Sequence, residues 1–365
     1  MKNIYDFYAD QFSAIFETYR ENFSGVCLVK NENEVLLSGA AGLANRDFNV
    51  PNTMTTRFDT ASVTKIFTAA AVLHLAQSGK LRLDDKIHSV LGRELEGTQI
   101  HENVLIENLL NHTSGIADDA DEEAGEDYSA LFAEKPNYAI RNCADFLPNF
   151  VHKPANFPPG TNVRYNNCAY VLLGLVIEKI TGTDYRTYTA RNIFEPAGMF
   201  NTYFGAKDEI CPNTAEGYFA LKNEDGGFIK WKKNIYSYPP IGTPDGGAFT
   251  TAGDLDIFIR GLKNGKILSR EYTDLIMKPH CDFTRQTKYG IWRTGYGLEF
   301  SEIPDRGFGK NIFCMYKEGG NPGVDAICSY FPAVDISINI LSNQDGPFWK
   351  MYGDFRDVLF KDTAR

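Results

Sequence analysis

Apolar residues recur with helical spacing from residue 3 to residue 20, and this pattern predicts an N-terminal helix. Two short apolar runs follow at residues 25–30 and 34–40, with a turn signal at 31–33 between them, and they predict a pair of strands. Residues 66–76 are apolar on almost every side, and Gly79 follows them as a stop signal. A helix with no polar face is buried, so this segment predicts an interior helix.

The remainder of the chain predicts a helical middle and then further strands. Helical patterns occupy residues 106–110, 139–150, 168–181 and 185–194. A capping box that begins at Thr251 predicts a helix over residues 253–263. Strand-like runs and a last helix follow at 296–300, 312–317, 325–331, 336–341 and 347–360.

Strands at both ends of the chain that enclose helices predict an α+β fold. We expect α/β/α layers around one antiparallel sheet built from the N- and C-terminal segments, with a mainly helical lobe inserted. The whole chain, residues 1–365, would be a single catalytic unit. Residues 1–85 and 215–365 would form the sheet-containing lobe and residues 86–214 the helical lobe, with the active site between them.

Composition and charge narrow the choice of partners. Of 365 residues, 43% are hydrophobic and 23% are charged, which is enough apolar material for a large core. The net charge of −10 argues against nucleic acids and anionic membranes, since these bind clustered Lys and Arg. No run is apolar enough to cross a bilayer and the first ten residues lack an apolar leader, so we expect a cytoplasmic protein. The oligomeric state stays open.

Two further features of the composition suggest structure rather than chemistry. The seven cysteines form no Cys-x-x-Cys pair and no zinc spacing, so we expect reduced thiols and no metal site. The acidic stretch at residues 118–127 predicts a solvated surface loop, as runs of charge usually do.

The strongest candidate chemistry is Ser62-Val-Thr-Lys65, directly before the apolar segment. Residues three apart on a helix stand roughly 5–6 Å apart, so the lysine can reach the serine hydroxyl. A serine becomes a nucleophile only beside a group that helps it to lose its proton. The first turn of a helix also directs free N–H groups and a positive dipole end at this serine. Taken alone, such a pair more often represents a helix cap and a solvated charge.

A second candidate segment is Tyr165-Asn-Asn167, the only Tyr-x-Asn in the chain. A phenol with a pKa of about 10 is a poor base at neutral pH, but two nearby ammonium groups would favour the phenolate. The amide of Asn167 both donates and accepts, so it could connect a lysine to a substrate amide. Taken alone, Tyr165 is more simply one of nineteen tyrosines with a packing role.

A third candidate segment, Lys317-Glu-Gly-Gly320, lies between two strand-like runs. Gly319 and Gly320 carry no side chain, so a substrate backbone could approach the strand edge closely there. Lys-x-Gly is a weak pattern that also occurs at Lys263 and Lys288, and the glycine-rich continuation favours the copy at Lys317.

In this order, Ser62-x-x-Lys65, Tyr165-x-Asn167 and Lys317-x-Gly319 resemble the three motifs of the serine β-lactamase and penicillin-binding-protein family. The likeness is greatest to its class C branch and to the related DD-peptidases, D-aminopeptidases and β-lactamase-type esterases. Further segments resemble the family as well: residues 57–62, 79–84, 109–115, 159–161, 194–199 and 246–254.

The resemblance implies a serine hydrolase without a cofactor, which acts through an acyl-enzyme on a small ester, amide, D-amino-acid peptide or β-lactam. Ser62 would attack the carbonyl carbon, and Lys65 and Tyr165 would move the proton, with the choice of base between them open. The backbone N–H groups of Ser62 and Gly320 would hold the oxyanion. The substrate-binding residues that the resemblance implies are Asn167, Lys317, Glu318, Gly319 and Gly320.

Glu318 departs from the family pattern, which usually has Thr, Ser or a small residue at this position. In an edge strand its side chain would point into solvent. If it faces the cleft instead, its charge would disfavour substrates with a carboxylate, including most β-lactams. This departure and the expected cytoplasmic location favour a peptidase, amidase or esterase over a true β-lactamase.

Other classes of protein fit the sequence less well. A Ser-His-Asp hydrolase would need a Gly-x-Ser-x-Gly elbow, but Ser114 stands in His-Thr-Ser-Gly. A metal hydrolase would need a pair such as His-x-x-x-His, which the six histidines do not form. A non-hydrolytic or slowly deacylating penicillin- or peptide-binding protein would keep the same pocket, and it stands as the open alternative.

Overall fold

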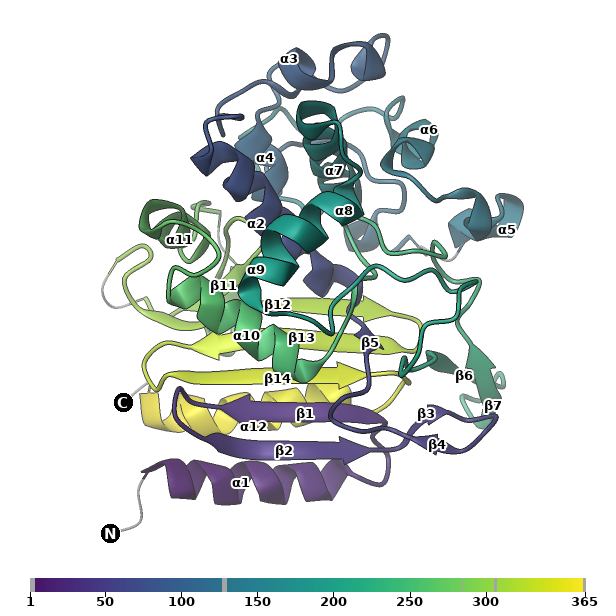
Figure 1. Ribbon diagram of the computed structural model, residues 1–365, viewed down its shortest axis with the longest axis vertical. Coiled ribbons are helices and arrows are strands. Elements are labelled where there is room, and N and C mark those ends of the chain that lie inside the picture. Colours follow the sequence, from purple (N-terminus) through teal and green to yellow (C-terminus); the bar gives the residue numbers. More distant parts are fainter. Residues whose placement is uncertain (1–3, 127–129, 284, 305–306, 364–365) are drawn as a thin grey trace.

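Strands from both ends of the chain form one sheet in the computed structural model, which describes residues 4–126, 130–283, 285–304 and 307–363 (Figure 1). The sheet has eight strands in the order β2-β1-β14-β13-β12-β11-β10-β9, and each neighbouring pair is antiparallel. The N-terminal β1 pairs with the C-terminal β14, so that Gly25 lies opposite Ser342. The predicted α+β fold around an antiparallel sheet is confirmed.

The elements of this fold have the following bounds. The strands of the main sheet are β1 (Gly25–Lys30), β2 (Val35–Ala41), β9 (Arg285–Thr287), β10 (Gly290–Thr294), β11 (Glu299–Glu302), β12 (Ile312–Asn321), β13 (Val324–Phe331) and β14 (Ile336–Ser342). Three small pairs add β3 (Leu43–Asn45) with β4 (Val50–Pro51), β5 (Phe58–Asp59) with β8 (Phe249–Thr250), and β6 (Tyr218–Lys222) with β7 (Phe228–Lys233). The α-helices are α1 (Ile4–Tyr19), α2 (Thr64–Gln77), α3 (Ile87–Leu91), α4 (Ile106–Leu110), α5 (Leu131–Glu134), α6 (Leu147–Phe150), α7 (Asn167–Thr181), α8 (Tyr185–Thr189), α9 (Glu195–Ala197), α10 (Ala252–Lys263), α11 (Arg270–Ile276) and α12 (Phe348–Thr363). Two short 3-10 turns matter for the site, η1 (Ala61–Val63) and η3 (Glu122–Ala124).

Helices cover both faces of the sheet, and each face has its own apolar core. On one face α1 packs against α12, where the rings of Phe12 and Phe355 meet edge to face at 5.3 Å. On the other face α10 packs against β1, β13 and β14 (Figure 1). The helices α3 to α8 gather at the end of the molecule away from β2 (Figure 1). The boundaries proposed for the two lobes stay a prediction.

The interior helix predicted from the apolar segment is α2, and it connects the sheet to the helical end. Nearly all of its residues are buried, among them Lys65. The ring of Phe67 lies edge to face against the rings of both Phe194 and Phe258. Aromatic contacts of this kind help to hold the helix, and with it the turn at its N-terminal end, in place.

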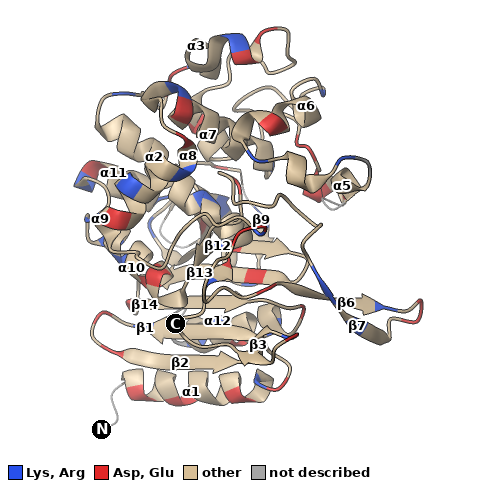
Figure 2. Ribbon diagram, turned by 45° about the vertical axis from the view of Figure 1, so that its right-hand side comes forward, with Lys and Arg blue, Asp and Glu red and all other residues tan. Residues whose placement is uncertain are grey.

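Several local predictions were wrong. The expected strand at 296–300 begins only at Glu299, because Gly297 has a φ of +77° and its turn packs against α2. The expected helix at 139–150 consists of short turns and the four-residue α6, which has Pro148 near its start. The hairpin β6–β7, which projects from the body in Figure 2, and the strands β9 and β10 were not predicted. Residue 3 of the predicted first helix lies outside the described residues.

None of the helices in the described ranges combines the length and the apolar character needed to cross a membrane. All seven cysteines are free thiols.

Candidate active site

Ser62 lies on the turn η1, directly before α2, and the residue before it is strained. Ala61 has a φ of +42°, in the left-handed region that residues other than glycine rarely adopt. The carboxylate of Asp59 holds this turn, because it accepts the Ala61 N–H at 2.8 Å and the Tyr238 hydroxyl at 2.6 Å. The turn is therefore fixed by a buried network, and sequence reasoning did not identify Asp59 as part of it.

The Ser62 hydroxyl oxygen is the point where the first two motifs meet. Lys65 Nζ donates to Ser62 Oγ at 3.1 Å, and the Tyr165 hydroxyl donates to the same oxygen at 2.7 Å. The other two donors of Lys65 are also occupied, by Asn167 Oδ1 at 2.7 Å and by the carbonyl oxygen of Asp245 at 2.6 Å. The structure thus brings together all four residues expected from the first two motifs.

Burial lowers the pKa of Lys65 to about 8, and the charge of Lys317 acts in the same direction. The negative charge of Asp245 partly opposes this shift. A lysine with such a pKa is partly neutral at physiological pH, so it can accept a proton from Ser62.

Tyr165 lies near two lysines, but its pKa shifts in the direction opposite to the one expected from the sequence. Lys65 Nζ and Lys317 Nζ stand 4.9 and 4.7 Å from the centre of its ring. Burial nevertheless raises the pKa of Tyr165 well above its usual value, and the negative charge of Glu122 adds to the effect. The idea that two ammonium groups bring Tyr165 toward phenolate is therefore wrong for the free protein.

Lys317 is paired with a carboxylate that sequence reasoning missed. Its side chain is buried, and Nζ donates to Glu299 Oε1 at 2.6 Å. The other oxygen of Glu299 accepts the indole N–H of Trp292 at 2.7 Å. The charge of Glu299 also raises the pKa of Tyr165, so this carboxylate opposes any effect of Lys317 that would favour a phenolate.

The third motif lies in β12, which is inside the sheet and not at its edge. The ladder between β11 and β12 ends at Tyr316, whereas β13 continues alongside as far as Asn321. The backbone from Lys317 onward is therefore unpaired on the β11 side, which leaves an open strand edge beside Ser62. Gly319 touches the nucleophile turn: a Cβ atom there would stand 2.3 Å from Thr60 O and 2.8 Å from Ser62 N.

Glu318 is exposed and lines an open cleft that Ser62, Tyr165 and Lys317 also line. Successive side chains in a strand point to opposite faces, so Glu318 lies on the face of β12 opposite to Lys317. Partial desolvation in the cleft and the charge of Glu299 raise the pKa of Glu318 to about 7. Both interpretations of Glu318 were thus partly right, since the side chain is solvated and also borders the cleft.

The acidic stretch at 118–127 is solvated over only part of its length, so the predicted surface loop is partly right. Asp118 and Asp119 are buried, although Glu122 to Glu126 are exposed and Asp127 lies outside the described residues. The Asp118 carboxylate accepts the backbone N–H of Asn167 at 2.8 Å and that of Cys168 at 3.0 Å. It therefore caps the N-terminal end of α7, where unpaired N–H groups attract an anion.

Asp118, Asp119 and Cys168 are also close enough together to be considered as metal ligands, with ligand atoms within 4.8 Å of one another. The carboxylates already accept backbone N–H groups, one of Asp119 from Ala120 at 2.9 Å. Burial raises the pKa of Asp118 and of Asp119, because the charged form is costly to hold in the interior. We therefore interpret the cluster as structural: it holds the start of α7, and with it Asn167, in place.

Glu122 is a further acidic residue at the site. It lines both the open cleft and a second cavity beside Ser62, and its Oε1 accepts the Asn167 side-chain N–H at 2.9 Å. Asn167 is consequently fixed at both ends of its amide, by Glu122 and by Lys65. The sequence held one available signal for this residue, its place in the acidic stretch at residues 118–127.

The family model described as "Beta-lactamase" matches residues 12–360. The chain belongs to the Beta-lactamase family. Among solved structures, the penicillin-binding protein from Bacillus halodurans is 33% identical, with a TM-score of 0.85 over 95% of this chain and 99% of that one. The predicted family and its fold are confirmed.

Two other proteins resemble this chain at lower identity. Protein flp of Staphylococcus aureus is 29% identical over 70% of this chain and 48% of its own length, so the chain spans about half the length of this curated relative. A D-stereospecific amidohydrolase from Streptomyces shares the fold, with 21% identity and a TM-score of 0.75 over 94% of this chain and 97% of that one.

Proposed function

We propose that this protein is a serine hydrolase that forms an acyl-enzyme at Ser62 with a small ester, amide or D-amino-acid peptide. The observation that carries the proposal is the convergence of Lys65 Nζ and the Tyr165 hydroxyl on Ser62 Oγ, at 3.1 and 2.7 Å. Proton-transfer groups within hydrogen-bond reach of a serine are what nucleophilic catalysis requires. Family membership supports the same chemistry.

Lys65 is the better candidate for the base. With a pKa of about 8, roughly a tenth of it is neutral at pH 7, and the neutral amine can accept the Ser62 proton as the hydroxyl oxygen bonds to the carbonyl carbon. Tyr165 keeps its proton in the free protein, so it can donate to the leaving group as that group departs. Water then hydrolyses the ester by the same proton transfers in reverse.

The oxyanion would bind between the backbone N–H groups of Ser62 and Gly320. The close approach of Gly319 to Ser62 N supports this arrangement, because it brings the open edge of β12 beside the nucleophile turn. Two preorganised donors of this type contribute about 10²–10³ in rate per donor in other hydrolases.

The charges of the cleft bear on the substrate. Glu299 neutralises Lys317, and Glu318 adds a further carboxylate to the cleft wall. A substrate carboxylate beside Lys317 would therefore meet repulsion, which argues for an esterase, amidase or D-aminopeptidase and against a true β-lactamase. A D-stereospecific amidohydrolase shares the fold, so D-amino-acid amides are among the first substrates to test. The cytoplasmic location and a partner limited to small molecules stay predictions.

Covalent labelling tests the proposal. A fluorophosphonate probe should add to the wild-type protein, and Ser62→Ala should abolish the adduct seen by intact-mass measurement. Ser78→Ala is a matched control, since Ser78 is exposed at the other end of α2. Labelling of Ser62→Ala at the wild-type rate would place the nucleophile elsewhere.

Turnover separates the hydrolase from the open alternative. p-Nitrophenyl esters, D-amino-acid amides and nitrocefin should show at least one hydrolysed substrate class. A stable adduct at Ser62 without product release would instead identify a slowly deacylating binding protein.

A further inference from the structure

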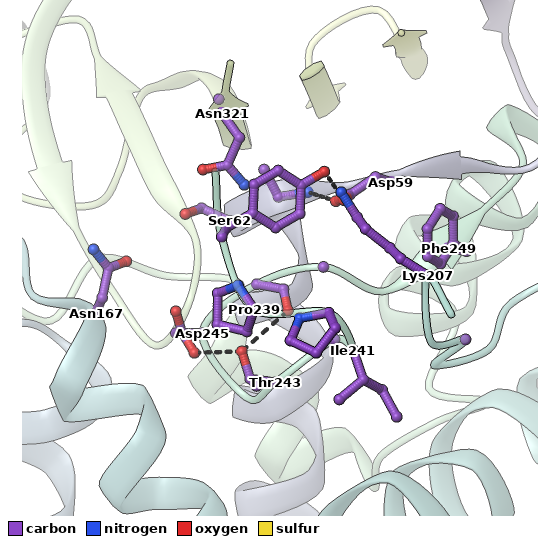
Figure 3. Close-up of a pocket in the computed structure, with 18 of the residues that line it drawn as sticks. Asp59, Ser62, Asn167, Lys207, Pro239, Ile241, Thr243, Asp245, Phe249 and Asn321 are labelled. Carbon is purple, nitrogen blue, oxygen red and sulfur yellow. Dashed lines mark hydrogen bonds between the residues drawn. The ribbon is translucent and has the colours of Figure 1, made fainter. Parts of the chain in front are cut away.

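The open cleft beside Ser62 is where a substrate has room. It holds about 520 Å³ of free space, which is within the range of small-molecule sites. The second cavity beside Ser62, which Thr243 and Asp245 line, holds about 30 Å³, or roughly one water molecule (Figure 3). Tyr165, the proposed proton donor to the leaving group, lines the cleft and not this small cavity. The leaving group of a substrate would therefore lie in the cleft.

Charges along the wall of the cleft are arranged unequally. Among the described residues that line it, carboxylates outnumber cations: Glu122, Glu123, Glu299 and Glu318 against Arg285 and Lys317. Arg285 lies on β9, the edge strand, and neighbouring strands are about 4.8 Å apart, so β9 is roughly 14 Å from β12, which carries Glu318. The guanidinium carbon of Arg285 stands 5.7 Å from the centre of the Trp292 ring on β10. The part of the cleft beside β12 is therefore acidic.

The carboxylate of Glu318 has no partner of its own. Within the described part of the chain, no donor hydrogen-bonds to it and no Lys or Arg nitrogen lies within 4.0 Å of it. The adjacent cation, Lys317, is held by Glu299. Partial desolvation and the charge of Glu299 raise the pKa of Glu318 to about 7, and the opposing effects of Lys317 and Arg356 are smaller. A cation bound beside Glu318 would therefore be stabilised, since each charge favours the other.

An exposed aromatic ring lies near this carboxylate. Trp349, at the start of α12, lines the cleft and is 41% exposed. Its indole N–H donates to Asp325 Oδ1 at 2.9 Å, which holds the ring in place. Asp325 pairs with Gly320 across β13 and β12, so it is a diagonal neighbour of Glu318 on the same face of the sheet, roughly 7–8 Å away. The cleft thus offers an unpaired carboxylate and an aromatic face close together.

We propose that Glu318 and Trp349 are specificity-determining residues that bind a cation, and that the substrates are esters or amides whose leaving group carries an ammonium group. This inference rests on the proposed acyl transfer at Ser62. The carboxylate attracts the positive charge, and the face of the indole ring binds it through a cation–π contact. The ammonium group would remain in the cleft while Tyr165 donates its proton to the departing atom.

The test uses acetate esters of choline and of its homologues with three to five carbons between oxygen and nitrogen, each paired with the neutral ester in which carbon replaces nitrogen. At pH 8, above the pKa of Glu318, the wild-type protein should favour the charged member of at least one pair in kcat/KM. For that pair, the charged-to-neutral ratio should fall about fivefold in Glu318→Gln and by a similar factor in Trp349→Leu, as expected for a solvated ion pair and a cation–π contact. Glu224→Gln, which removes a carboxylate from the exposed turn between β6 and β7, should leave the ratio unchanged. The absence of a preference in every pair, or a wild-type ratio in an active Glu318→Gln or Trp349→Leu, would overturn the proposal.

A binding measurement keeps the two proposals distinguishable. In the Ser62→Ala protein, which lacks the proposed nucleophile, the charged ester should bind about fivefold or more tightly than its neutral analogue by calorimetry. Adding Glu318→Gln should remove most of this difference. Failure of every ester to react with the wild-type protein would refute the acyl-enzyme but leave this measurement intact. Equal binding of the two esters by the Ser62→Ala protein, or binding of neither, would refute the cation subsite.

Discussion

Replacing Gly319 by alanine should disable the site without removing any of its chemical groups. The added Cβ would stand 2.3 Å from Thr60 O, 2.8 Å from Ser62 N and 3.0 Å from Val63 N. All three are backbone atoms, so no side chain can turn away to make room. Because an ordinary contact needs about 3.4 Å or more, β12 and the turn η1 would have to separate by about 1 Å.

The size of the effect follows from that displacement. A shift of about 1 Å in a reacting group costs on the order of 10² in rate, and overpacking costs about 1–3 kcal/mol of stability. We therefore expect Gly319→Ala to lower kcat/KM about a hundredfold and to lower the free energy of unfolding within that range. Steady-state hydrolysis of a p-nitrophenyl ester and urea unfolding measure the two quantities.

The adjacent glycine provides a matched comparison. A Cβ on Gly320 would meet only Asp325 Oδ1, at 3.9 Å, and the alanine would keep its backbone N–H. Gly320→Ala should therefore lose no more than about fivefold in kcat/KM, since nothing has to move. The reasoning would be refuted if Gly319→Ala kept activity within about threefold of wild type, or if both variants lost activity equally.

Three further predictions concern charges at the site. If Lys65 is the base, kcat/KM should rise about tenfold per pH unit below pH 8 and level off above it, because the neutral amine is the active form. A flat profile from pH 6 to 9 would contradict this assignment. Glu318→Thr should raise kcat/KM for nitrocefin relative to a neutral p-nitrophenyl ester, since it removes a negative charge from the cleft wall. Unchanged selectivity would show that this charge does not affect substrate binding. Asp118→Asn should lower the free energy of unfolding by about 1–2 kcal/mol in urea titrations, because the single amide oxygen replaces two oxygens that each accept an N–H group at the start of α7. An unchanged unfolding midpoint would contradict the capping role of Asp118.

Local sequence patterns predicted much of the framework. The apolar character of residues 66–76 indicated an interior helix, because a helix with no polar face has to be buried. Apolar runs near both ends of the chain indicated the strands that became β1, β12, β13 and β14. Where glycine or proline interrupted a pattern, as at Gly297 and Pro148, local periodicity failed, since a turn or a tertiary contact then decides the backbone.

For the site, three short motifs in order, and the family that they resemble, were enough to name the candidate residues Ser62, Lys65, Tyr165, Asn167 and Lys317. Their pKa values and charge pairing, in contrast, depend on residues that are remote in the sequence. The carbonyl of Asp245 that holds Lys65 lies 180 positions away in the chain, and the carboxylate that neutralises Lys317 comes from another strand. Spacing along a helix or strand fixes near neighbours, but desolvation and charge pairing depend on which distant segments pack together. The buried cap that Asp118 forms on α7 and the raised pKa of Tyr165 therefore became visible only in the folded protein.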